Sequence, residues 1–212
     1  VTVCYGMTET SPVSFQSSVD TPNERRTSTV GRVHPHVECK VVNPETGETE
    51  RVGEPGELLT RGYNVMAGGY WGNREATKQV VDEDGWMHTG DLAVIDAEGY
   101  CSIVGRNKDT IIRGGENIAP REIEELLHKH GEVYDVQVVG VPCSKFGQQV
   151  CACVVVHGRE EATAEELEAL ASDLRTFVAE SLSHHKVPKY VRFVEKFPMT
   201  VSGKVQKHIL AD

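Results

Sequence analysis

Short runs in which apolar and polar residues alternate fill the first hundred positions, and turns that contain glycine or asparagine separate them. Alternation of this kind predicts β-strands. The predicted strands are Val37–Val42, Gly56–Gly62, 91–95 and 100–104. The last two flank residues 96–99, which predict a hairpin turn, and residues 73–81 predict a short helix. We therefore expect the first half of the chain to be rich in β-structure.

After Gly105 the apolar residues take up helical spacing. Pro120 suits the first turn of a helix, and Ile123, Leu126, Leu127 and His130 follow it at that spacing. A second helix is predicted after Thr163 and Glu166, which form a capping-box pattern. Its apolar stripe comprises Leu167, Leu170, Leu174, Phe177 and Val178.

Three runs rich in β-branched residues, 134–141, 150–156 and 189–195, predict strands around these helices. The order after Gly105 is strand, helix, strand, strand, helix, strand. This order predicts a compact α+β unit with its helices on one face of a small sheet. We predict two domains, 1–105 and 106–212, joined through the polar residues 106–109.

The composition, 39% hydrophobic and 25% charged over 212 residues, is typical of soluble globular domains. Lys and Arg number 22 against 32 Asp and Glu, so the formal net charge is −10. An acidic chain disfavours bulk binding to nucleic acid or anionic membranes, but a nucleotide needs only a few local cations. No apolar run approaches the ~20 residues of a transmembrane helix, and no signal peptide is recognised.

The six cysteines lack CxxC pairs and zinc-finger spacing with histidine. We interpret them as reduced, small apolar residues of an intracellular protein in the cytoplasm or mitochondrial matrix, which disfavours a cysteine metal site. Cys151 and Cys153, two apart in a predicted strand, are expected on one face.

Four segments carry candidate chemistry. In the first, Gly6 permits a tight turn after Tyr5, Thr8 presents a hydroxyl, and Glu9 offers a carboxylate for Mg²⁺. A solvated Thr-Glu cap is the alternative.

In the second segment, Asp91 follows a glycine and precedes a strand, where a carboxylate can accept hydrogen bonds from ribose hydroxyls. The alternative is a plain Gly-Asp turn, and His88 nearby is interpreted as a packing or surface residue.

The third segment is 105–118. Arg106 offers a planar fork for phosphate or ribose oxygens, and Lys108 lies in a polar trio suited to a joint between two bodies. Gly114 and Gly115 permit positive φ and close approach of a thin ligand. A charged turn before a buried strand is the alternative explanation of the same residues.

In the fourth segment, a Ser202-Gly203 turn would project Lys204, whose charge can stabilise a phosphoryl transition state. An ordinary exposed lysine is the alternative.

Taken in order, these motifs resemble the adenylate-forming superfamily, which includes acyl-CoA synthetases, peptide-synthetase adenylation domains and firefly-type luciferases. The matching segments are Tyr-Gly-x-Thr-Glu, Gly-Glu-Leu, Thr-Gly-Asp, Gly-Arg-x-Lys-Asp, Gly-Gly-Glu-Asn-Ile and Ser-Gly-Lys. Residues 62–71 and 114–120 look most like medium-chain-type fatty acyl-CoA synthetases, the group related to acyl-CoA synthetase family member 2. The resemblance implies the β-rich end of a large AMP-binding domain followed by a small mobile C-terminal α+β domain.

The resemblance also implies a reaction in two steps. A fatty acid and ATP give an acyl-adenylate and pyrophosphate, and CoA then releases AMP and forms acyl-CoA. By the resemblance, Tyr5 beside Gly6 would pack near the adenine, Thr8 would contact the AMP phosphate and Glu9 would hold Mg²⁺. Asp91 would bind the ribose hydroxyls, and Arg106 would assist at the nucleotide.

In the C-terminal domain, the resemblance implies that Lys204 supports adenylate formation and that Lys108 is the hinge. Gly114 and Gly115 would line the pantetheine tunnel.

The glycine-rich phosphate loop and most of the acyl pocket of this superfamily have no match in the chain. We therefore expect a C-terminal fragment, inactive without the preceding N-terminal portion of the same enzyme. Two alternatives stay open. One is an adenylation domain or aryl-CoA ligase with another acceptor, and the other is a non-catalytic binding module that retains the fold.

Overall fold

The computed structural model describes residues 1–158, 162–201 and 203–211. It divides into two compact units, Val1–Asn107 and Lys108–Asp212. The division falls after Asn107, within the polar segment 106–109 and two residues beyond the predicted boundary.

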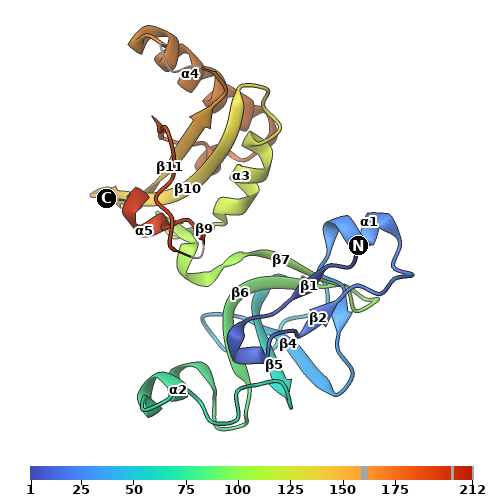
Figure 1. Ribbon diagram of the computed structural model, residues 1–212. Coiled ribbons are helices and arrows are strands. Elements are labelled where there is room, and N and C mark those ends of the chain that lie inside the picture. The colour runs from blue at the N-terminus through green and yellow to red at the C-terminus, as the bar shows by residue number, and fades with distance from the viewer. Residues whose placement is uncertain (159–161, 202, 212) are drawn as a thin grey trace. The chain divides into compact units, whose positions relative to one another are not determined.

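The first unit contains two antiparallel sheets. The larger has the order β4-β5-β6-β7, in which each strand pairs with its neighbour in sequence (Figure 1). Its strands are β4 (Val37–Val42), β5 (Gly56–Gly62), β6 (Met87–Ile95) and β7 (Cys101–Arg106). The smaller sheet comprises β1 (Cys4–Tyr5), β2 (Phe15–Gln16) and β3 (Arg32–Val33). Its helical segments are η1 (Thr8–Thr10), α1 (Asn23–Ser28) and α2 (Arg74–Val80), and the short segment η2 (Asn107–Asp109) spans the division between the units.

Each predicted element of the first unit is present, although β6 begins four residues before the predicted start at Asp91. The strand starts early because Met87 is buried and pairs with Thr60 of β5. Helix α2 begins at Arg74, one residue after the predicted start, because Asn73 caps it: the Asn73 side chain accepts a hydrogen bond from the Ala76 N–H at 3.0 Å. The core between the sheets contains Phe15, Val41, Leu58, Ala93 and Cys101.

In its described residues, the second unit is a five-stranded sheet with three α-helices. Its strands are β8 (Ile111–Arg113), β9 (Glu116–Ile118), β10 (Val133–Cys143), β11 (Gly147–Val156) and β12 (Tyr190–Phe193). Its helical segments are α3 (Pro120–Leu127), α4 (Ala164–Ser181), η3 (His184–Lys186) and α5 (Lys207–Ala211). Strands β10 and β11 form a long antiparallel hairpin, and β12 runs parallel to β11. The predicted α+β class is confirmed, and the first predicted strand is a β8–β9 hairpin.

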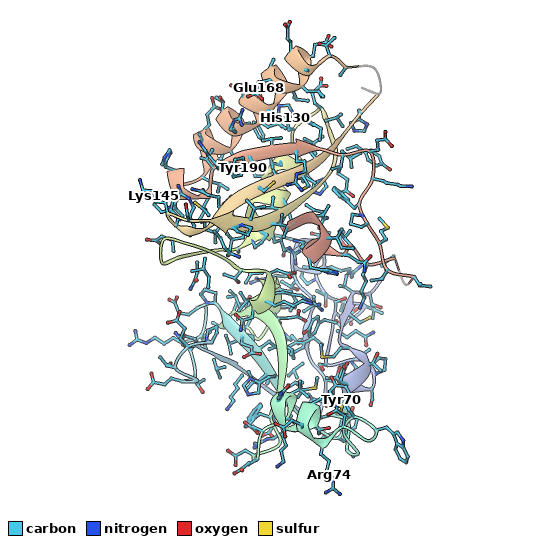
Figure 2. The ribbon with its side chains drawn as sticks, turned by 90° about the vertical axis from the view of Figure 1, so that its left-hand side faces the viewer. Tyr70, Arg74, His130, Lys145, Glu168 and Tyr190 are labelled. Atoms are coloured by element: carbon cyan, nitrogen blue, oxygen red, sulfur yellow. The ribbon has the colours of Figure 1, made fainter. Side chains whose placement is uncertain are left out.

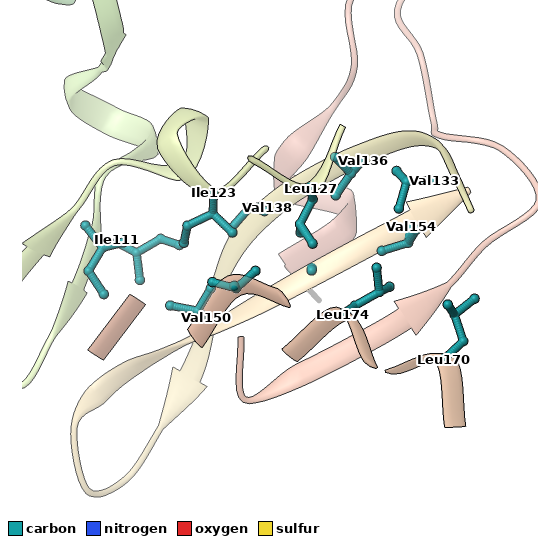
Figure 3. Close-up of a cluster of buried hydrophobic side chains, with 13 residues drawn as sticks. Ile111, Ile123, Leu127, Val133, Val136, Val138, Val150, Val154, Leu170 and Leu174 are labelled. Carbon is teal, nitrogen blue, oxygen red and sulfur yellow. The ribbon is translucent and has the colours of Figure 1, made fainter. Parts of the chain in front are cut away.

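Alternate residues of the β10–β11 hairpin face two apolar clusters. Val138 and Ala152 contribute to the cluster under α3 and α4, which Figure 3 shows with Leu127, Leu170 and Leu174. The opposite face carries the second cluster, which comprises Val139, Val141, Cys151, Cys153, Phe197 and Leu210. The two predicted helices share one face as expected, and the unpredicted α5 supplies Leu210 to the other. Because both faces are covered, β11 reads as a continuous apolar run.

Two details of the predicted helices differ in the structure. Helix α3 ends at Leu127, so His130 lies beyond it, where its ring contacts Phe177 edge-on with centroids 5.1 Å apart. In α4 the capping box of Thr163 and Glu166 is confirmed, and the Leu170 and Leu174 stripe is buried, while Leu167 is partly exposed.

The cysteines are free thiols, and Cys101, Cys151 and Cys153 are buried. Cys151 and Cys153 share one face, as predicted. Cys39 and Cys143 are partly exposed, and Cys4 is exposed. Within the described residues, no helix is long and apolar enough to cross a membrane.

Candidate functional site

The first candidate site centres on the carboxylate of Asp91. The β6–β7 register places Arg106 directly opposite Asp91, and the Arg106 Nε donates to Asp91 Oδ1 at 2.8 Å. The Tyr5 hydroxyl donates to the other oxygen, Oδ2, at 2.7 Å. The Asp91 side chain is only 7% exposed. The structure thus gathers three of the predicted nucleotide-binding residues, from positions 5, 91 and 106, around one buried anion.

The predicted Gly-Asp turn is instead part of β6, at an irregularity in its pairing with β5, and β5 holds it in place. Gly90 has a φ of +70°, which suits glycine, and its N–H donates to Glu57 Oε1 at 3.1 Å. The Thr89 hydroxyl donates to the Leu58 carbonyl at 2.7 Å and accepts from the Asp91 N–H at 3.1 Å. These contacts fix the backbone from which the Asp91 side chain projects.

The sequence motifs include Glu57 only as the middle residue of Gly-Glu-Leu and do not indicate a role for its carboxylate. Glu57 is buried, and its Oε2 lies 3.1 Å from His88 Nδ1. His88 therefore contacts the same Glu57 carboxylate that holds the Gly90 N–H. The sequence predicted only a packing or surface residue at this position. A carboxylate inside the apolar run of β5 was the signal that could have identified Glu57.

Tyr5 is tuned to act as a hydrogen-bond donor. Burial and the hydrogen bond to Asp91 raise the pKa of the Tyr5 phenol well above its ordinary value of 10.0. An ionised phenol beside the Asp91 carboxylate would place two negative charges together. The phenol therefore stays protonated to a higher pH than an ordinary tyrosine and continues to donate to Asp91 there.

We expect Tyr5 to be among the last of the six tyrosines to ionise in an alkaline titration followed by tyrosinate absorbance. Because its pKa is raised on folding, the stability that it contributes is fully present below its unfolded pKa near 10 and is lost as pH rises through the higher folded value. Tyr5→Phe should remove one of the last steps and leave the earlier steps of the titration in place. Loss of an early step in Tyr5→Phe, with the late steps intact, would contradict this assignment.

The second candidate feature is the loop that carries Thr8 and Glu9. Gly6 is required here, because a Cβ at this position would lie 1.8 Å from the Pro12 carbonyl oxygen. Glu9 Oε1 accepts a hydrogen bond from the Tyr70 hydroxyl at 2.8 Å, and the Thr8 residue is exposed. Tyr70, labelled in Figure 2, was missed as a partner of Glu9 by sequence reasoning.

The donor set at Glu9 can be compared with the needs of Mg²⁺. Within the described ranges, no group of three or more His, Cys, Asp or Glu residues could hold a metal ion. Mg²⁺ at phosphate-transfer sites is commonly held by one or two carboxylates together with substrate phosphates and water. A partly exposed carboxylate such as Glu9 fits that arrangement.

In the second unit, Gly114 and Gly115 form the two-residue turn of the β8–β9 hairpin, between the paired residues Arg113 and Glu116. Their φ angles of +61° and +90° are typical of a type I′ turn. The Gly114 N–H donates to the Phe146 carbonyl at 2.8 Å, and a Cβ on Gly114 would lie 3.2 Å from the Phe146 ring. Local structure therefore requires this double glycine, whether or not a ligand approaches it.

Lys204 lies on an exposed turn closed by the paired residues Met199 and Val205. The Thr200 N–H donates to the Lys204 carbonyl at 2.8 Å, and the Lys204 N–H donates to the Thr200 hydroxyl at 3.1 Å. Gly203 adopts a φ of +78°. The predicted turn at Ser202 falls outside the described residues. Lys108 is exposed in η2, at the first position of the second unit.

Two family models match the chain. The AMP-binding enzyme model matches residues 1–71, and the AMP-binding enzyme C-terminal domain model matches residues 122–204. The medium-chain acyl-CoA ligase ACSF2, mitochondrial, of Bos taurus is 47% identical over 210 residues, which is 99% of this chain and 33% of that protein. The chain belongs to the adenylate-forming, AMP-binding enzyme family. The resemblance inferred from the ordered motifs is confirmed.

Solved structures agree with this membership of the adenylate-forming family. ATP-bound MatB from Rhodopseudomonas palustris has a TM-score of 0.88 and 36% identity, covering 100% of this chain and 40% of that one. The o-succinylbenzoate CoA synthetase MenE from Bacillus subtilis, in complex with the acyl-adenylate intermediate OSB-AMP, has a TM-score of 0.85 and 30% identity, covering 100% and 41%. The chain thus spans about a third of the length of the ACSF2 relative and about two fifths of these structures.

Proposed function

We propose that the chain is the C-terminal part of an AMP-forming acid-thiol ligase, which converts a fatty acid, ATP and CoA into acyl-CoA, AMP and pyrophosphate. The observation that carries the proposal is the buried Asp91 carboxylate, held by Tyr5 and Arg106. Each oxygen of a carboxylate can accept about two hydrogen bonds. Tyr5 donates to one oxygen and Arg106 Nε to the other, so both oxygens keep capacity to accept a ribose hydroxyl.

The proposed roles in the first unit centre on the nucleotide. Asp91 would bind the ribose hydroxyls, and Arg106 would orient Asp91 and face the nucleotide. Tyr5 would pack near the adenine beside Gly6. Thr8 would contact the AMP phosphate, and Glu9 would hold Mg²⁺, which when bound supplies charge compensation to phosphate oxygens.

In the second unit, we propose that Lys204 supports adenylate formation and that Gly114 and Gly115 line the path of pantetheine. The ammonium of Lys204 would offset negative charge that develops on the transferring oxygens. Lys108 would act as the hinge, because one unit can serve two half-reactions in turn if it rotates between them. The fatty acid and CoA are the proposed partners of the whole enzyme.

The named relatives support a fatty acid as the substrate and mitochondria as the compartment. ACSF2 is named as a medium-chain and mitochondrial ligase, and MenE was solved with an acyl-adenylate. We therefore propose a medium- or long-chain fatty acid and the mitochondrial matrix, with the cytoplasm as the alternative location. The solved structure of ATP-bound MatB supports ATP as the nucleotide.

The test supplies the full-length enzyme with ATP, CoA and fatty acids of graded length, and measures acyl-CoA, AMP and pyrophosphate. We expect all three products together. The 212-residue chain by itself is expected to give little or no acyl-CoA, and robust product from it would contradict the proposal. Adenylate formation with transfer only to an acceptor other than CoA would favour an adenylation domain, and activation of aryl acids alone would favour an aryl-CoA ligase. No adenylate from any acid would favour a non-catalytic module.

A further inference from the structure

The loop that carries Lys204 is fastened at both of its ends. Before the loop, Phe197 is 5% exposed and packs in the apolar cluster that also contains Leu210 of α5. After it, the Gln206 N–H donates to the Pro198 carbonyl at 2.8 Å. Between these ends Lys204 is exposed. The loop therefore projects from a fixed base.

The base of the loop consists of Phe197 and Pro198 before it and Gln206 and Lys207 after it. Lys207 forms a partly buried ion pair with the rest of the second unit. Lys207, the first residue of α5, donates from Nζ to Glu124 Oε1 of α3 at 2.7 Å and to the Val138 carbonyl of β10 at 3.4 Å. The same Glu124 oxygen accepts the Val138 N–H at 2.7 Å. The side chains of Lys207 and Glu124 are 23% and 15% exposed. One lysine thus connects the loop to a helix and to a central strand.

This ion pair differs in kind from an exposed surface pair. Exposed pairs contribute little, because water and salt screen them. For a largely buried pair, removal of one partner leaves the other charge poorly solvated and without its hydrogen bond. Lys207 lies three residues after Lys204, a span of roughly 10 Å at most. Movement of the base is therefore transmitted directly to Lys204.

We propose that the Glu124–Lys207 pair positions Lys204 for adenylate formation. By holding the base of the loop, the pair limits the orientations that the Lys204 ammonium can take when it meets the transferring phosphoryl group. The inference rests on the proposed role of Lys204. Glu124 and Lys207 are positioning residues in this scheme, since neither touches the reacting atoms.

The chain offers a matched control on the same helix. Glu122 of α3 pairs with Lys186 of η3, with Nζ–Oε2 and Nζ–Oε1 distances of 2.6 and 2.9 Å. The Lys186 side chain is 22% exposed, close to that of Lys207. This second pair ties α3 to η3, whereas the first ties α3 to the residue that follows the Lys204 loop. Loss of either pair removes a lysine–glutamate contact from α3, and only loss of the first releases the loop.

The first experiment compares the half-reactions in the full-length enzyme. Lys207→Met should slow acyl-adenylate formation on the order of 100-fold, which is the scale expected for a catalytic group misplaced by about 1 Å. Thioester formation from supplied acyl-adenylate should be unchanged, and Lys207→Arg should restore most of the adenylation rate. Lys186→Met should leave both half-reactions unchanged. Equal losses in both half-reactions, or equal effects of the two methionine variants, would overturn the proposal.

The second experiment measures amide hydrogen exchange in the 212-residue chain and does not depend on activity. The Gly203 and Gln206 amides are hydrogen-bonded within the loop, so their exchange reports its order. Lys207→Met should speed their exchange about tenfold, consistent with loss of a hydrogen bond to a charged group. Lys186→Met should not. Glu124→Gln, which keeps an acceptor for the Val138 N–H, should act in the same direction as Lys207→Met with a smaller effect.

The two experiments separate failure of this inference from failure of the proposed function. A full-length protein that forms no adenylate from any acid would refute the proposed function, and hydrogen exchange would then decide whether the pair holds the loop. Unchanged exchange in both Lys207→Met and Glu124→Gln would overturn the inference, even in an enzyme that is fully active.

Discussion

Lys204→Ala in the full-length enzyme is expected to abolish acyl-adenylate formation and to spare thioester formation from supplied acyl-adenylate. The side chain is exposed on a turn held by backbone contacts to Thr200, so its removal should leave the fold intact. Loss of one preorganised charge or donor at a transition state commonly costs on the order of 10²–10³ in rate. Pyrophosphate release measures the first half-reaction, and consumption of synthetic acyl-adenylate with CoA measures the second.

The control for this substitution is Lys196→Ala. Lys196 is exposed and lies just before the buried Phe197, so it carries the same charge near the same loop without lying on the turn. We expect both half-reactions to proceed normally in this variant. If Lys204→Ala depressed both half-reactions equally, the division of labour between the two steps would be refuted.

Asp91→Asn is expected to weaken ATP binding strongly. The amide keeps the size of the carboxylate but loses its charge and presents an N–H₂ group at one oxygen position, facing either the Tyr5 hydroxyl or Arg106. A hydrogen bond to a charged group contributes about 1.5–3 kcal/mol, so loss of one or more raises the KM for ATP by roughly 10- to 100-fold. The value of kcat should change less, because ribose contacts are made in both ground and transition states.

Asp96→Asn provides the comparison for Asp91→Asn. Asp96 follows the same strand and pairs with Arg25 at 2.8 Å, but its side chain is 32% exposed. We expect Asp96→Asn to leave the KM for ATP unchanged. An Asp91→Asn enzyme with normal KM and reduced thermal stability would instead assign Asp91 a structural role with Tyr5 and Arg106.

Much of the candidate site could be predicted because its residues lie in short motifs with local chemistry. The sequence identified Asp91, Arg106 and Lys204 as candidates, since each directly follows a glycine within one of the ordered motifs. Their pairing partners were harder to recognise. Glu57 and Tyr70 come from strands or loops far away in sequence, and no local spacing indicates which side chain will meet Gly90 or Glu9.

The double glycine shows that a motif residue can also be required by local structure alone. Gly114 and Gly115 suggested a ligand path, and the structure shows that a type I′ hairpin needs them in any case. A proposed CoA contact at this turn therefore requires its own test, because the hairpin by itself explains both positive φ angles.

The α+β class, the order of most elements and the family could be predicted from the amino-acid sequence alone. These follow from periodicity, capping and ordered motifs, which are local properties of the chain. Tertiary structure decided which groups meet: Tyr5 with Asp91, Tyr70 with Glu9, and Lys207 with Glu124. Partners 61 to 86 residues apart are brought together by strand register and by helix packing. Such contacts depend on the whole fold, and for that reason the base of the Lys204 loop became visible only in three dimensions.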